Sequence, residues 1–344
     1  MAEDPRAWIH GDEAAREALA RVLSARPFLL LPPLHRVPLR VGNVVEIAGA
    51  SNSAKSQVLL QAAVHCILPK EWRGIHFGGL ERVVAYFDLD CRFDVLRLSQ
   101  ILRHRIMEHF GSTHHTDWQM NEGCQKNDTK VAWTCEFDEE LLLSCMRRFL
   151  YIRCYSSSDF LAALKTLHGQ SERKSDALGS GIYFLMIDSI GAFYWIDRTC
   201  QPLPLGDNKR KNLSPQTLAE SIVQEIRKLL ELQPMLVLAS KTTLFGAGSL
   251  TNATQRTSGK WHSVEATDFR TSNWDGRRNL PFHEYMPLVW QSFVTHRVQL
   301  QVSEGFTSEV ENKQLSVYIS EWVQPPLNIK DKFTVRDDGI VVIP

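Results

Sequence analysis

The sequence lacks a net charge of either sign. Lysine and arginine together number 39 of 344 residues, and aspartate and glutamate together also number 39. A chain balanced in this way has no overall electrostatic field that draws it to nucleic acid. Any contact with DNA therefore has to come from a local basic segment.

Paired cysteines and long apolar runs are also missing. The 7 cysteines are scattered without a Cys-x-x-Cys pair, which argues against a disulfide scaffold and against the common zinc-site spacings. No run approaches the roughly 18 apolar residues of a membrane span, and the N-terminus has no apolar signal region. We therefore expect no membrane contact and a reducing compartment, the cytosol or the nucleus.

Five apolar runs alternate with segments of helical periodicity. The runs lie at residues 44–48, 83–87, 149–152, 182–187 and 235–239. Near-continuous apolar strands that alternate with helices are typical of a parallel sheet buried on both faces. Beyond residue 295 apolar and polar residues alternate, which predicts antiparallel strands that finish the sheet. The predicted fold class is α/β.

The clearest helix start is Ser214, an N-cap residue followed by Pro215 at the first helical position. A shorter amphipathic helix is expected at 13–25. After it, prolines break an apolar segment from Phe28 to Leu34, which we expect to be exposed on the monomer and covered by a partner.

Two polar stretches interrupt this order, at about 111–136 and 244–281, and are predicted to be insertions. The second also contains aromatic residues, which is a functional hint. The predicted organisation is an N-terminal helix and Pro-rich linker at 1–40, a core at 41–303 and C-terminal strands at 304–344.

A phosphate-binding loop is predicted between the first strand and the first core helix. The loop matches G-x-x-x-x-G-K-[ST] in this context, so its N–H groups and lysine are expected to bind ATP and its last hydroxyl Mg²⁺. Ala54 replaces the second glycine, and its Cβ is expected to strain a positive-φ backbone by about 1–2 kcal/mol. The alternative is an ordinary turn with a solvated lysine. The predicted ATP-binding residues are Gly49, Ala50, Ser51, Asn52, Ser53, Ala54, Lys55 and Ser56.

Acidic residues end two of the predicted strands. Asp188 follows the run 182–187, at the carboxyl end where parallel sheets place ligands, and is expected to hold Mg²⁺ together with Ser56. Asp88 and Asp90 end another strand, where one acid can orient an attacking water. Alternatively, both cap the helix that begins near residue 93.

In order and spacing, these features resemble the RecA-like recombinase superfamily. Four strings narrow the resemblance to the eukaryotic recombinase paralogs, and Ala192 to Arg198 is the most specific of them. The other three are Cys66 to Lys70, Phe93 to Leu98 and Tyr155 to Ser158, and the resemblance extends through Glu284 to Pro287, Trp290 and Thr295 to Arg297.

The resemblance implies a RecA-like core with a mostly parallel sheet. Strand-exchange recombinases carry an N-terminal helical domain, and with a loop beginning at Gly49 we expect no such domain here. The resemblance further implies a nuclear protein of homologous-recombination repair of double-strand breaks and of meiosis. Such a protein binds ATP and DNA in a heteromeric complex with other recombinase paralogs, particularly the D-type one.

The chain departs from the superfamily at three positions tied to ATP turnover. Asp90 stands where these recombinases carry a catalytic glutamate, so the resemblance assigns Asp90 the catalytic role. A γ-phosphate-sensing glutamine is missing from residues 240–243, and Ala54 replaces a glycine. We therefore expect ATP binding with weak hydrolysis.

In RecA-like proteins two loops face DNA, here at about 198–213 and 244–281. Residues 241–281 contain six lysines or arginines against three acids, a composition suited to phosphate contacts and base stacking on single-stranded or branched DNA. Alternatively, the aromatic residues pack on a partner subunit. The predicted DNA-contact residues are Arg256, Lys260, Trp261, Arg277 and Arg278.

Two other functions fit the same residues. One is a P-loop NTPase or kinase acting on a small substrate, with Asp88 or Asp90 binding its hydroxyl. The other is a structural subunit that does not bind nucleotide.

Overall fold

The computed structural model describes residue 29 and residues 31–117, 138–174, 181–199, 214–245, 282–310 and 313–343. The helix expected at 13–25 and all five predicted DNA-contact residues lie outside these ranges.

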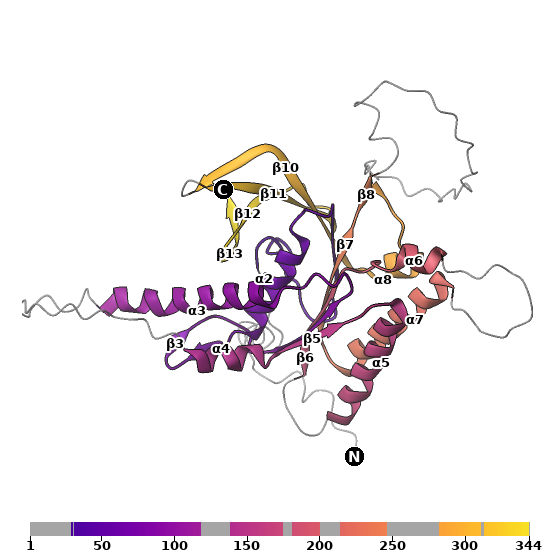
Figure 1. The fold of residues 1–344 in the computed structure, drawn as a ribbon, viewed down its shortest axis with the longest axis horizontal. Helices are drawn as coiled ribbons and strands as arrows, with labels where there is room; N and C mark the ends of the chain where they lie inside the picture. The colour runs from indigo at the N-terminus through magenta and orange to yellow at the C-terminus, as the bar shows by residue number, and fades with distance from the viewer. Residues whose placement is uncertain are drawn as a thin grey trace, which may run out of the picture.

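A nine-stranded sheet runs through the centre of the described chain (Figure 1). Its order is β13-β12-β11-β10-β1-β7-β6-β4-β5. The strands from β10 to β5 all pair in parallel, which confirms the prediction of a mostly parallel sheet. The five predicted apolar runs form β1 (Val44–Gly49), β4 (Val83–Asp88), β5 (Phe149–Arg153), β6 (Ile182–Asp188) and β7 (Leu236–Thr242).

The C-terminal strands are antiparallel, as the alternating pattern predicted. β10 (His296–Val310) joins β1 in parallel and is followed by β11 (Lys313–Gln324). β12 (Lys330–Arg336) and β13 (Gly339–Ile343) complete this side of the sheet. β10 is continuous across residue 303, where the sequence suggested the end of the core.

Helices cover both faces of the sheet (Figure 1). Each face has its own core, because alternate residues of a strand point to opposite sides. The first face carries α2 (Lys55–Ile67), α3 (Val95–Asp117) and α4 (Glu139–Met146), and the second carries α5 (Ser157–Lys174), α6 (Tyr194–Thr199), α7 (Pro215–Leu232) and α8 (Leu288–Phe293).

Two short ribbons lie outside the main sheet. One pairs β2 (Glu71–Trp72) with β3 (Ile75–His76). The other pairs β8 (Leu244–Phe245) with β9 (Phe282–His283), so the two ends of the stretch predicted as the second insertion lie side by side.

Ser214 caps α7 as predicted, because its side chain accepts a hydrogen bond from the N–H of Thr217. α3 continues through residues 111–117, which the polar composition had placed in an insertion. None of the helices among the described residues combines the length and the apolar character needed to cross a bilayer.

The expectation of an exposed linker is wrong for its described part. Leu29 and Leu34 are both 1% exposed and belong to the core beneath α2 and α3. Arg36 then anchors the linker, since its Nε lies 2.9 Å from Oδ2 of Asp331 in β12. The apolar segment is thus covered by the chain itself.

The prediction that the parallel strands are buried on both faces is wrong for β5. β5 ends the sheet within the described chain, and its Leu150 and Tyr151 are 41% and 42% exposed. A run of four apolar residues does not distinguish an edge strand from a central one.

Candidate nucleotide site

The carboxyl ends of four parallel strands meet at one edge of the sheet. The register places Gly49 of β1 beside Thr242 of β7, and Asp88 of β4 beside Asp188 of β6. The predicted loop and the predicted acids are therefore brought together at this edge, where open α/β sheets bind ligands.

The loop of residues 49–56 folds tightly around its lysine. A Cβ at Gly49 would collide with the hydroxyl of Ser53 and the carbonyl of Leu300, so only glycine fits there. The Ser53 hydroxyl donates to the carbonyl of Ala50 at 2.8 Å. Nζ of Lys55 donates to the carbonyls of Gly49 and Ala50, at 2.9 and 2.5 Å, which holds the ammonium group inside the loop.

The N-terminus of α2 is open to an anion. Its cap residue, Ala54, has φ 63° and ψ 19° and provides no side-chain hydrogen bond. The positive φ at this alanine is the conformation predicted from the motif. Ser56 is exposed in the first turn, as are Ser51 and Asn52 in the loop. Uncapped N–H groups at a helix N-terminus attract negative charge.

Lys55 carries the positive charge of this site. Burial lowers the pKa of its ammonium group to about 8, while the nearby Asp188 and Asp90 act in the opposite direction. A desolvated ammonium group inside a loop of backbone N–H groups is suited to a phosphate ligand.

Asp88 and Asp90 have different roles. Asp88 accepts hydrogen bonds from the backbone N–H groups of Arg92 and Phe93, both at 3.2 Å, and from the Tyr151 hydroxyl at 2.9 Å. Asp88 is buried and orders the turn before α3, whose own N-terminus is capped by Asp94 through the N–H of Leu96 at 2.8 Å. The alternative that Asp88 and Asp90 cap this helix is therefore wrong. Asp90 accepts one side-chain hydrogen bond, from Ser189 at 2.8 Å.

Asp90 is electrostatically linked to the rest of the site. Desolvation raises the pKa of its carboxyl group, the Ser189 hydrogen bond lowers it, and the neighbouring Asp188 raises it. Of these two acids, Asp90, which follows β4, is the one that acts on the pKa of Lys55.

Asp188 is held by two hydroxyl groups that sequence reasoning missed. Tyr86 of β4 donates to its Oδ2 at 2.7 Å, and Ser240 of β7 donates to its Oδ1. A tyrosine inside an apolar run is typical of core packing, so the sequence contained no signal for this contact.

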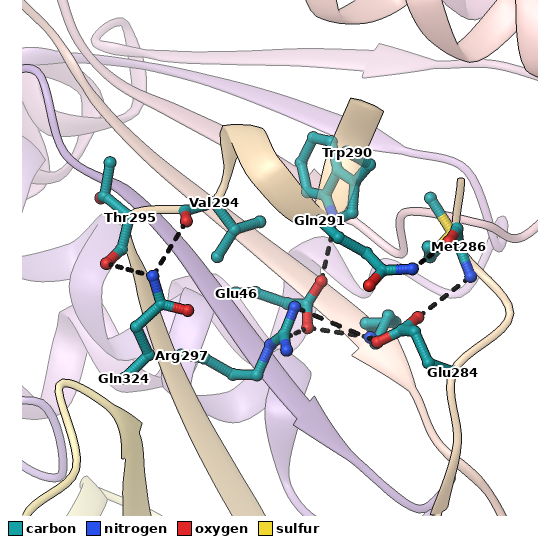
Figure 2. Close-up of polar contacts among 10 residues, drawn as sticks. Glu46, Glu284, Met286, Trp290, Gln291, Val294, Thr295, Arg297 and Gln324 are labelled. Carbon is teal, nitrogen blue, oxygen red and sulfur yellow. Dashed lines mark hydrogen bonds and ion pairs between the residues drawn. The ribbon is translucent and has the colours of Figure 1, made fainter. Parts of the chain in front are cut away.

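Lys241 directly follows Ser240 in β7, so its side chain points to the other face of the sheet, where it joins a charge cluster. Figure 2 shows Glu46, Glu284 and Arg297 of this cluster. Nζ of Lys241 lies 2.9 Å from Oε1 of Glu46 and 2.6 Å from Oε2 of Glu284. Nε of Arg297 lies 2.7 Å from the same oxygen of Glu46. The positive charges of Lys241 and Arg297 thus equal the negative charges of the two carboxylates.

Glu46 is the centre of this cluster. It is fully buried in β1, and the indole N–H of Trp290 in α8 donates to its Oε2 at 2.8 Å. Glu284 follows β9, so Lys241 links the end of β7 to the β8–β9 ribbon. A glutamate within an apolar strand was the one available sequence signal of this cluster.

We predict that Ala54→Gly stabilises the fold by about 1 kcal/mol. Glycine removes the strain of a positive φ, and this gain exceeds the extra conformational entropy that glycine loses on folding. Ala62→Gly, in the middle of the same helix, should destabilise the fold by about 1 kcal/mol. Urea unfolding of both variants measures the difference. A fall in stability for both would show that Ala54 is unstrained.

Lys241→Met should destabilise the fold by about 3–5 kcal/mol, because it leaves the buried carboxylate of Glu46 and the half-buried carboxylate of Glu284 with one cation. Adding Glu284→Gln restores the balance and should recover most of the loss. Lys330→Met is the matched control, since its ion pair with Glu321 lies at the surface and should contribute less than about 1 kcal/mol. Chemical denaturation that found the single and double variants equal would contradict charge balance as the cause.

No protein-family model matches the chain. It is 47% identical to the DNA repair protein XRCC2 homolog of Arabidopsis thaliana over 341 residues, which cover 97% of this chain and 89% of that protein. It is 25% identical to the DNA repair protein XRCC2 of Mus musculus over 302 residues, covering 87% and 84%. The chain therefore belongs to the XRCC2 family of RecA-like recombinase paralogs.

Proposed function

We propose that this chain binds ATP and Mg²⁺ and acts in homologous-recombination repair of DNA as a subunit of a heteromeric recombinase-paralog complex in the nucleus. Two relatives are named as DNA repair proteins, which supports the repair role. We propose the D-type paralog as its first partner. We also propose that the chain acts in meiotic recombination.

The observation that carries ATP binding is the position of Lys55. Its ammonium group lies inside a loop that ends in the uncapped N-terminus of α2, and it is close enough to Asp188 and Asp90 to be influenced by both. Lys55 and the N–H groups of residues 49–56 would hold the phosphates. Ser56 and Asp188 would hold Mg²⁺, which neutralises phosphate charge when bound.

Single-stranded or branched DNA is the proposed nucleic-acid partner. The contact residues proposed from the sequence lie outside the described residues, so their basic and aromatic composition is what supports them. They are Arg256, Lys260, Trp261, Arg277 and Arg278.

Hydrolysis is proposed to be weak. Asp90 is one methylene shorter than glutamate, and its carboxylate is already held by Ser189. In the segment 240–243, Ser240 is committed to Asp188 and Lys241 to the charge cluster. Misplacing a water by about 1 Å can cost on the order of a hundredfold in rate.

ATP binding should weaken as pH rises through the pKa of Lys55. That pKa is about 8, so the protonated amine that attracts phosphate falls about tenfold between pH 7 and pH 9. Titration of a fluorescent ATP analogue should show a matching loss of affinity. Lys55→Arg is the control, since its guanidinium stays charged and should give a flat pH profile. An equal pH profile for both would contradict the role of Lys55.

Steady-state turnover tests the second part of the proposal. The purified complex with its paralog partner should bind ATP, and Lys55→Ala should weaken that binding while leaving assembly intact. Asp90→Ala should change a slow turnover little. Rapid wild-type hydrolysis that Asp90→Ala abolishes would overturn the weak-ATPase proposal, and an absence of ATP binding would favour a structural subunit.

A further inference from the structure

We propose that Tyr86, acting with Ser240, is a positioning residue that fixes the Asp188 carboxylate for the Mg²⁺ of a bound nucleotide. This inference rests on the proposed function and goes beyond it, because neither residue belongs to the phosphate-binding loop or its acids.

The contact spans three neighbouring strands. Asp188 ends β6, and its flanking strands β4 and β7 supply Tyr86 and Ser240. One hydroxyl donates to each carboxylate oxygen, so the plane of the carboxylate is fixed from both sides. Each oxygen of a carboxylate can accept a further hydrogen bond, which leaves Asp188 able to hold a Mg²⁺-bound water.

Alternation along the strands places these groups on the face that carries α2. Tyr86 lies in the same core as Met186 and Leu238, which precede Asp188 and Ser240 by two residues. Lys55 begins α2 on this face. The hydroxyl pair therefore acts on the side of the sheet where the phosphates are proposed to lie.

Tyr86 is itself rigidly held. It is 1% exposed, and its ring packs against Phe93 and Phe149 with centroids 5.0 and 5.6 Å apart. Groups that orient a metal-binding residue in this way typically contribute 10–100-fold to metal affinity.

The chain offers a matched control in Tyr151. It is the register partner of Tyr86 on the adjacent strand β5, and its hydroxyl also donates to an aspartate, at 2.9 Å. That aspartate is Asp88, which orders the turn before α3. Each variant, Tyr86→Phe or Tyr151→Phe, therefore deletes a hydrogen bond from a tyrosine, two residues before the end of its strand, to an aspartate. Only the Tyr86 hydrogen bond is made to Asp188.

The experiment measures, on the full-length chain, the affinity for a fluorescent ATP analogue in EDTA and in saturating Mg²⁺. The ratio of the two affinities is the gain that Mg²⁺ provides. Tyr86→Phe should lower this gain about tenfold while changing the affinity in EDTA less than about twofold. Ser240→Ala should act in the same direction, and Ser240→Thr, which keeps the hydroxyl, should restore the gain. Tyr151→Phe should match the wild type.

Two readouts separate positioning from general damage. Melting temperatures in EDTA show whether each variant is folded, and electron paramagnetic resonance of Mn²⁺ substituted for Mg²⁺ reports metal binding directly. Equal gains for Tyr86→Phe and Tyr151→Phe would overturn the proposal and leave ATP binding standing. A wild-type chain that bound no nucleotide in either buffer would instead overturn the proposed function, and this role with it.

Discussion

The buried carboxylate of Glu46 is the constraint on which the central part of the structure depends. Removing a charge from water costs several kcal/mol unless it is fully paired, and Glu46 has no exposed surface. Lys241, Arg297 and Trp290 pair it from β7, β10 and α8. These elements must therefore meet β1 in one register. Because the phosphate-binding loop proposed here starts at the end of β1, that register also sets where the loop begins.

β7 transmits this constraint to the other face of the sheet. Ser240 and Lys241 are consecutive, so their side chains point to opposite faces, one to Asp188 and the other to Glu46. A shift of β7 that broke the charge cluster would also withdraw the hydroxyl from Asp188. Buried ion pairs are weak evidence for stability but are well suited to fixing a register. The cluster thus explains why a sheet core would retain charges at this point.

Local patterns predicted what depends on neighbouring residues, and failed where the partner is distant. Apolar runs located the five parallel strands, and the positive φ at Ala54 followed from the motif. The prediction of an exposed linker was wrong because Arg36 binds Asp331, which lies 295 residues further along the chain. Nothing close to Arg36 in the sequence indicates that partner. Tyr86 was missed for the same reason, since only the order of the strands brings it to Asp188.

Under the function proposed here, the division between Asp88 and Asp90 would allow ATP binding and ATP turnover to separate. An acid that already accepts three hydrogen bonds, as Asp88 does, is part of the scaffold and is not free to activate water. Asp90 accepts a single side-chain hydrogen bond, from Ser189, but its side chain is one methylene shorter than that of glutamate. Under the function proposed here, ATP would act mainly as a ligand of the folded state, which it stabilises by about 2.7 kcal/mol at a hundred times its dissociation constant. A site of this kind would contribute to the proposed complex by being occupied, and slow hydrolysis would preserve that occupancy.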